Sequence, residues 1–198
     1  MLKKCFALGV LLTGLCAGAV WADTVLTRDD ALKALSHPGR WIDTDGAPQP
    51  DGTYLAKQIQ IAATATIGPK EEPSIYGPVE NLERAKGTMK VLGYRIVYDG
   101  QTKIQDENKK VILSSKIQEG SAVKVQGNLQ PNGVFQASKI KLQKIEKGKT
   151  KPKTKIYGPA SAVDPRAGTL KVLNTTIKLR PDAQITEQAA QTPNPNSR

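Results

Sequence analysis

The chain has 198 residues, a formal net charge of +11 at pH 7, two cysteines and one histidine. A charge of this sign and size favours anionic partners without specifying which. Because Cys5 and Cys16 both lie in the first 22 residues and His37 is the single histidine, the sequence after residue 22 argues against a disulfide, a thiolate nucleophile and a zinc site built by one chain.

Residues 1–22 have the pattern of a secretory signal peptide. Two lysines precede an apolar run over residues 5–20, and the letters VWA at 20–22 place small residues where a signal peptidase reads them. The run is too short for a membrane span. We therefore expect cleavage after Ala22, which leaves a periplasmic or secreted protein of formal charge +9. Lipoprotein anchoring at Cys16 is disfavoured, because Leu15 stands where a lipidation motif has a small residue.

The next segment, residues 23–61, is expected to form a short helix followed by strands. The helix is expected over 27–37, where Thr27 can cap it and acidic residues occupy its first turn. Three acidic residues, Asp43, Asp45 and Asp51, come close together after it. We interpret them as turn residues, because the spacing of an EF-hand calcium loop is absent.

Residues 75–142 are interpreted as one complete repeat unit. The letters IYGP occur at 75–78 and again at 156–159, and an offset of 81 positions aligns residues 75–104 with 156–185 without a gap. The same offset aligns residues 39–61 with 120–142. In each copy apolar positions alternate over two strands, joined by a tight hairpin turn expected at Gly93-Tyr94 and at Asn174-Thr175.

The two ends of the chain are then halves of a further unit. Residues 23–61 supply the back half, residues 156–185 the front half, and residues 186–198 a tail that we expect to be disordered. The halves could close a second barrel within one chain, or by exchange between two chains in a domain-swapped homodimer. About five short strands per unit and one short helix predict an all-β fold of small OB-like Greek-key barrels.

Three motifs of the central unit resemble a known family. They are Gly-Thr-x-x-Val-Leu-Gly-x-x-Ile at 87–96, Gly-x-x-Val-x-Val-x-Gly at 120–127 and Asn-Gly-x-x-x-Ala-x-x-Ile at 132–140. The pattern is similar to a bacterial exported family catalogued as a domain of unknown function, the DUF5666-type domain. The resemblance implies OB-like β-barrel repeats and supplies no catalytic residues.

Two linkers of equal length, residues 62–74 and 143–155, differ in charge. The first holds one Lys and two Glu, and the second holds six Lys and one Glu, so the fold does not require the lysines. We interpret the second linker and the preceding strand either as a solvated basic segment or as a polyanion contact. The candidate residues are Lys139, Lys141, Lys144, Lys147, Lys149, Lys151, Lys153 and Lys155.

Aromatic side chains are a second kind of candidate contact. We expect Tyr94 to lie in the hairpin turn, free to contact a ligand, and Trp41 to lie outside the shared core because it aligns with Ala122. In OB barrels, exposed aromatic residues stack on bases or sugars. Tyr76 and Tyr157 recur beside the Gly-Pro pair, and we interpret them as packing residues.

The sequence shows no Gly-rich phosphate loop, paired-carboxylate signature or nucleophile elbow. We therefore expect no enzyme, no cofactor and no bound metal. The expected function is that of a periplasmic or secreted module for binding or assembly, which contacts an anionic envelope component or an acidic partner protein. A nucleic-acid-binding OB protein is one alternative, and a structural envelope protein that pairs through its edge strands is another.

Overall fold

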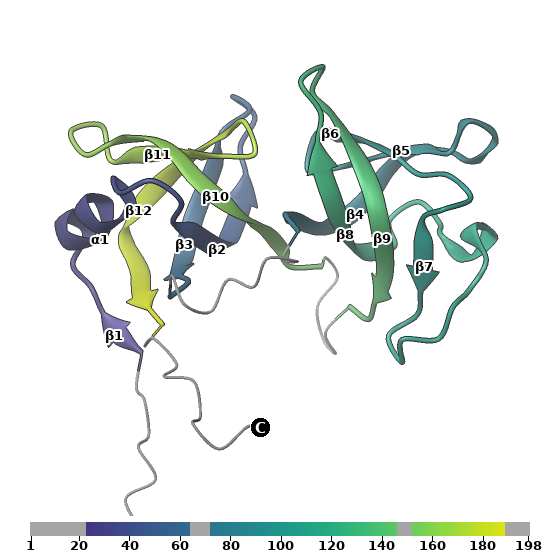
Figure 1. Cartoon of the computed structure of the whole chain (residues 1–198), viewed down its shortest axis with the longest axis horizontal. Coiled ribbons are helices and arrows are strands. Elements are labelled where there is room, and N and C mark those ends of the chain that lie inside the picture. The colour runs from purple at the N-terminus through teal and green to yellow at the C-terminus, as the bar shows by residue number, and fades with distance from the viewer. Residues whose placement is uncertain (1–22, 64–71, 146–151, 189–198) are drawn as a thin grey trace, which may run out of the picture.

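The structure is a computed structural model that describes residues 23–63, 72–145 and 152–188. It consists mainly of strands, which form two barrels lying side by side, with one α-helix packed on the first barrel (Figure 1). Each barrel is a closed ring of five strands. The predicted all-β class with OB-like barrels and one short helix is confirmed.

The first barrel combines strands from both ends of the chain. Its ring runs β3–β2–β10–β11–β12 and closes by a parallel pairing of β12 with β3. A further short strand, β1 (Thr24–Val25), pairs with β12 outside the ring. The five ring strands are β2 (Trp41–Pro48), β3 (Tyr54–Ile61), β10 (Thr154–Asp164), β11 (Thr169–Val172) and β12 (Thr175–Glu187).

The second barrel is built from one continuous stretch of chain. Its ring runs β4–β5–β6–β9–β8 and closes by the pairing of β8 with β4. A sixth strand, β7 (Lys103–Gln105), adds to the side of β9, and the chain also forms two single helical turns, η1 (Arg84–Lys86) and η2 (Ser114–Lys116). The ring strands are β4 (Ser74–Glu83), β5 (Thr88–Val91), β6 (Tyr94–Val97), β8 (Ala122–Leu129) and β9 (Val134–Gln143).

Helix α1 (Arg28–Leu35) begins as the sequence predicts and ends two residues earlier than predicted. The hydroxyl of Thr27 accepts a hydrogen bond from the backbone N–H of Asp30 at 3.2 Å, which satisfies one of the free donors of the first turn. Its buried residues, Ala31, Leu32 and Leu35, lie on one face and join the hydrophobic core.

A glycine bends the long hairpin of each barrel. The pairing of β8 with β9 shifts register at Gly127, and that of β2 with β3 shifts at Gly46. A Cβ atom at Gly127 would lie 2.0 Å from the carbonyl oxygen of Gln136, and one at Gly46 would lie 2.2 Å from that of Leu55. Only glycine lets the two backbones approach so closely at a bulge.

The hairpin turn of the central unit lies one residue earlier than predicted. Strands β5 and β6 pair as far as Val91 and Tyr94, so the turn is Leu92-Gly93, with φ values of 50° and 81°. Two positive φ values are typical of the type I′ turn that matches the twist of a hairpin. The prediction of a turn at Gly93-Tyr94 is wrong. Because a shift of one residue reverses the face of a strand, Tyr94 is buried instead of exposed.

The two barrels are joined through β10 and β4. Three residue pairs connect these strands in antiparallel register, so the hydrogen-bonded sheet continues from one barrel into the other. Tyr94 of the second barrel adds a side-chain link, because its hydroxyl donates to the carbonyl oxygen of Leu173 in the first barrel at 2.7 Å.

Several predicted segments fall outside the described residues. They include the signal peptide over 1–22 with its cleavage site, residues 64–71 and 146–151 of the two linkers, and the tail from residue 189. Two strands extend further than predicted, one into the second linker and one into the predicted tail. Strand β10 begins at Thr154, so Lys155 belongs to a strand and not to the linker, and β12 continues to Glu187.

Candidate functional site: a lysine face on the second barrel

Four lysines lie on the outer surface of the second barrel, on three neighbouring strands. Lys124 of β8 is directly opposite Lys141 of β9, and Lys139 of β9 is directly opposite Lys103 of β7. Ile140, which lies between the two β9 lysines, is fully buried, so its neighbours point to the solvent side of the sheet. We refer to this set as the lysine face: Lys103, Lys124, Lys139 and Lys141.

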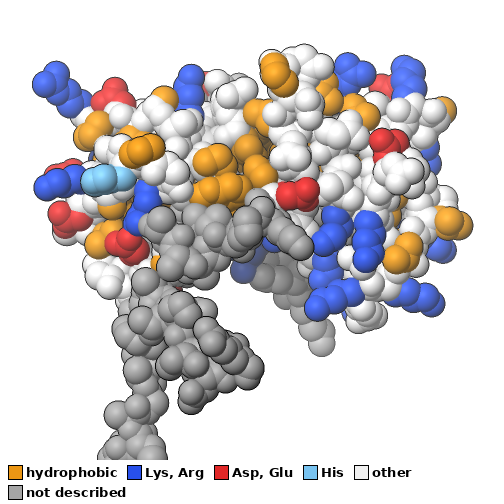
Figure 2. Space-filling view, viewed as in Figure 1, with side chains coloured by type: hydrophobic (Ala, Val, Ile, Leu, Met, Phe, Trp, Pro, Cys, Tyr) orange, Lys and Arg blue, Asp and Glu red, His pale blue; other side chains and the backbone are white. Residues whose placement is uncertain are grey.

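The lysine face is a local excess of positive charge. Figure 2 shows Lys and Arg side chains gathered over the part of the second barrel where β9 and β7 lie in Figure 1. Within residues 23–63, 72–145 and 152–188, none of its four ammonium groups forms an ion pair. Like charges directly opposite each other destabilise a sheet, with Cβ atoms only about 5 Å apart. The fold therefore gains nothing from this arrangement, and an anionic ligand would relieve the repulsion.

The first barrel provides an internal comparison. Where Lys124 faces Lys141, the first barrel has Asp43 opposite Gln60. Where Lys103 faces Lys139, it has Gln184 opposite Gln58. These positions accept neutral and acidic side chains in the same strand register, so the lysines are not required by the barrel.

The predicted basic residues separate into four groups. Lys139 and Lys141 belong to the lysine face, whereas Lys144 pairs with Glu107 at 2.5 Å and Lys155 pairs with Asp43 at 3.3 Å. Lys153 is exposed. Lys147, Lys149 and Lys151 lie outside the described residues. The role of all eight lysines in polyanion binding stays a prediction.

Two members of the lysine face, Lys103 and Lys124, were not among the predicted site residues. Lys124 was visible in the sequence as a solvent-side residue of an alternating strand, opposite in type to its counterpart Asp43. Lys103 could not be placed from the sequence, because its position depends on the parallel pairing of β7 with β9.

The two predicted aromatic contact residues have different outcomes. Tyr94 is buried in β6, so the expectation that it lies exposed in the hairpin turn is wrong. Its hydroxyl bonds to Leu173 and to Thr175 of the first barrel, and burial raises its pKa to about 12. Trp41 is half-buried and its ring lies 5.1 Å from that of Tyr157 at an interplanar angle of 45°. Tyr157 therefore packs on a side chain, as predicted.

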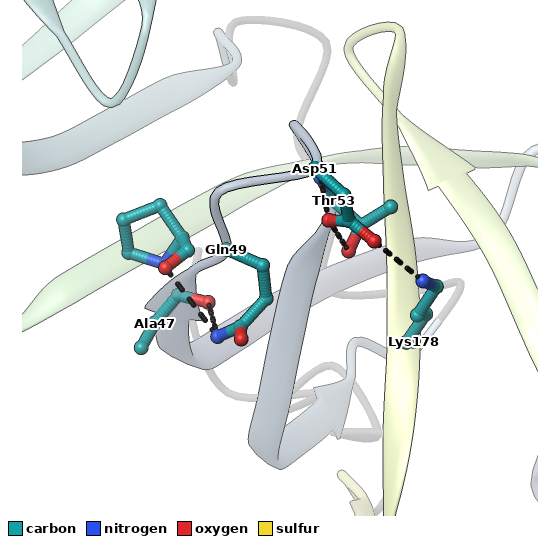
Figure 3. Close-up of polar contacts among 6 residues, drawn as sticks. Ala47, Gln49, Asp51, Thr53 and Lys178 are labelled. Carbon is teal, nitrogen blue, oxygen red and sulfur yellow. Dashed lines mark hydrogen bonds and ion pairs between the residues drawn. The ribbon is translucent and has the colours of Figure 1, made fainter.

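The cluster of acidic residues is only partly a turn. Asp43 and Asp45 lie in strand β2, so the interpretation of these two as turn residues is wrong. Asp51 lies in the β2–β3 turn, where its carboxylate accepts hydrogen bonds from Lys178 at 2.8 Å and from the hydroxyl of Thr53 at 2.6 Å (Figure 3). These donors hold the pKa of Asp51 well below its ordinary value. Of the described residues, no group of three His, Cys, Asp or Glu could hold a metal ion.

A cleft of about 410 Å³ lies between the two barrels. Residues of both barrels line it, including Tyr54, Leu92, Tyr94 and Ile156, and Glu80 supplies a carboxylate. None of the lysine face lines this cleft, so the two features are separate. Within the described ranges, no helix is long and apolar enough to cross a membrane.

Comparison with known proteins finds one family match, and it spans the lysine face. Residues 76–141 match the family described as a domain of unknown function (DUF5666). The match runs from β4 to β9, includes all four lysines, and confirms the resemblance drawn from the sequence motifs. No curated protein and no solved structure matched the chain. The second barrel of this chain is thus similar to the family described as a domain of unknown function (DUF5666).

Proposed function

We propose that this chain is a non-enzymatic binding module of the periplasm or the extracellular space, and that it contacts an anionic component of the cell envelope through the lysine face. The interaction is electrostatic and spread over several lysines. Because an ammonium group is a point charge without the planar fork of arginine, the contacts select charge density and not one ligand geometry.

One observation carries this proposal: two pairs of lysines stand directly opposite each other on neighbouring strands without a carboxylate partner among the described residues. Such an arrangement opposes folding slightly, and the first barrel has the same strand register without it. A feature that costs stability and is dispensable for the fold is best explained by binding.

The two alternatives have less support. A single-strand nucleic-acid platform needs exposed aromatic rings, and Tyr94 is 9% exposed with its hydroxyl bonded inside the protein. Pairing through edge strands needs a long free edge, whereas the strands at the two ends of the sheet order, β1 and β7, have two and three residues.

The proposal is tested by retention on immobilised heparin, a soluble model polyanion. A variant with Lys→Gln at the four positions of the lysine face should elute at clearly lower salt than the wild type. The salt dependence of binding should become shallower by about one unit per contacting lysine.

A matched control removes the same charge elsewhere. Lys→Gln at Lys33, Lys57, Lys90 and Lys171 changes four exposed lysines that form no ion pair with a described residue. If the two variants elute together, net charge and not the lysine face determines retention, and the proposal fails. Lys→Gln at the six lysines of residues 143–155 measures the contribution of the linker separately.

A further inference from the structure

Exposed apolar side chains gather at the edge of the lysine face. The large hydrophobic residues that remain exposed in the described part of the chain are Val25, Val111, Leu113 and Ile145, with exposed fractions of 78%, 64%, 76% and 39%. Three of these four belong to the second barrel, on the segments beside β7 and β9. Isolated exposed apolar residues are common, but a group of them beside a basic surface suggests a shared partner.

The strand register places Val111 on the same face as the lysines. Lys124 is opposite Lys141, Lys141 is opposite Gln105, and Gln105 forms an antiparallel bridge with Val111. Side chains directly opposite in a sheet lie on the same side of it. These pairings place Lys124, Lys141, Gln105 and Val111 in one row across the sheet, with the exposed valine at its end.

Leu113 continues this apolar edge. The intervening Ile112 packs against the hydrophobic core, and its backbone N–H donates to the carbonyl oxygen of Ile104 at 3.0 Å. The backbone at Leu113 is extended, so Val111 and Leu113 project away from the core on the side opposite to Ile112. Three further exposed lysines flank the pair in sequence: Lys109, Lys110 and Lys116.

Ile145 extends the same edge at the end of β9. It follows Lys144, whose ammonium pairs with Glu107 in the connection that leads from β7 to Val111. This ion pair ties the end of β9 to the connection. Exposed hydrophobic side chains and lysines therefore both occur on the segments that border this side of the barrel.

We propose that this border docks on an anionic lipid bilayer, with Val111 and Leu113 entering the interface between headgroups and acyl chains while the lysine face contacts the lipid phosphates. This inference rests on the proposed function and names its ligand. A soluble polyanion could satisfy the lysines, but it offers no apolar phase for the valine and the leucine. A bilayer surface satisfies both, because its headgroups are anionic and its acyl region accepts apolar side chains.

Each part of the surface should contribute a measurable factor. A lysine close to an anionic bilayer strengthens binding by about fivefold at low ionic strength. Replacing the exposed valine and leucine by serine removes several methyl and methylene groups from the interface, and should weaken binding by about tenfold or more. The lysine contribution falls with salt, whereas the apolar contribution does not.

The test is flotation of the full chain with vesicles of phosphatidylglycerol and phosphatidylcholine, and with vesicles of phosphatidylcholine alone. The neutral vesicles measure any binding by the apolar N-terminal run of residues 5–20, which all variants share. We compare the wild type with the double variant V111S/L113S, with the four Lys→Gln changes of the lysine face, and with V25S. The last variant removes the fourth exposed hydrophobic residue, which lies at the edge of the other barrel.

The expected result is binding to anionic vesicles that V111S/L113S and the lysine variant both weaken, and that V25S leaves unchanged. Retention of V111S/L113S on heparin should equal that of the wild type. If V111S/L113S binds anionic vesicles as the wild type does, the lipid inference is overturned, while a loss of heparin retention in the lysine variant still supports the proposed function. If the lysine variant keeps wild-type retention on heparin, the proposed function itself fails.

Discussion

The hydroxyl of Tyr94 provides a sharp test of how the two barrels are held together. The change Tyr94→Phe removes only the oxygen, which donates to the carbonyl of Leu173 at 2.7 Å and contacts the hydroxyl of Thr175. The ring itself stays buried against Phe135, with centroids 6.4 Å apart. The substitution therefore deletes a hydrogen bond between the barrels without creating a cavity.

The expected loss in the free energy of unfolding is about 1–2 kcal/mol. A hydrogen bond between uncharged groups contributes about 1 kcal/mol net, and a buried acceptor left without its donor adds to the loss. Thr175 can rotate its hydroxyl toward another acceptor, which keeps the loss at the lower end for that contact. The measurement is urea unfolding followed by circular dichroism, with the slope m checked for each variant.

Tyr98, four residues later, provides the matched control. It is 6% exposed, and its hydroxyl oxygen has no hydrogen-bond partner among the described residues. Because a buried unpaired hydroxyl is unfavourable, Tyr98→Phe should leave stability unchanged or raise it by up to about 1 kcal/mol. Equal losses in the two variants would show that the hydrogen bond is not the cause, and would refute the reasoning.

Tyr94 should also make the free energy of unfolding depend on pH. Burial raises the pKa of Tyr94 from the ordinary 10.0 to about 12. The neutral form of Tyr94 is thus favoured in the folded state. The contribution of Tyr94 to the free energy of unfolding is therefore complete below pH 10 and is lost as the pH rises through 12. The pKa values of Tyr54 and Tyr98 are also raised, so only the difference between wild type and Tyr94→Phe isolates Tyr94. An identical fall in both proteins above pH 10 would contradict this assignment.

Two further predictions concern the second barrel. Gly127→Ala places a methyl group 2.0 Å from the carbonyl oxygen of Gln136, so thermal unfolding should show a loss of more than about 2 kcal/mol, whereas Gly100→Ala, which has open space around it, should lose less than about 0.5 kcal/mol. Lys141→Gln removes the repulsion with Lys124 and should keep or raise the unfolding free energy by a few tenths of a kcal/mol, so a loss above about 1 kcal/mol would show that the lysine is structural.

The sequence alone determined much of the fold. Thr27 and the acidic residues after it predicted where the helix begins, since capping is a local interaction. Alternating apolar positions predicted two strands joined by a tight turn in the central unit, and β5 and β6 form that hairpin. The motifs of the central unit predicted its resemblance to the matched family, because turn glycines and core positions can be recognised from short stretches of sequence.

Other features were decided by the tertiary structure. The hairpin register, which separates an exposed Tyr94 from a buried one, depends on a choice between two adjacent turn positions, and packing of the ring makes that choice. The partners of Lys155 and Asp51 come from strands distant in the sequence.

The lysine face likewise exists only in the folded chain. Lys103 and Lys139 stand opposite each other because β7 pairs in parallel with β9, and Val111 joins their face through its bridge to Gln105. From the sequence, the polyanion contact was expected mainly in the second linker, because lysines are most frequent there along the chain. Charge density on a surface depends instead on which strands are neighbours, and non-local pairing, which no local pattern encodes, determines that.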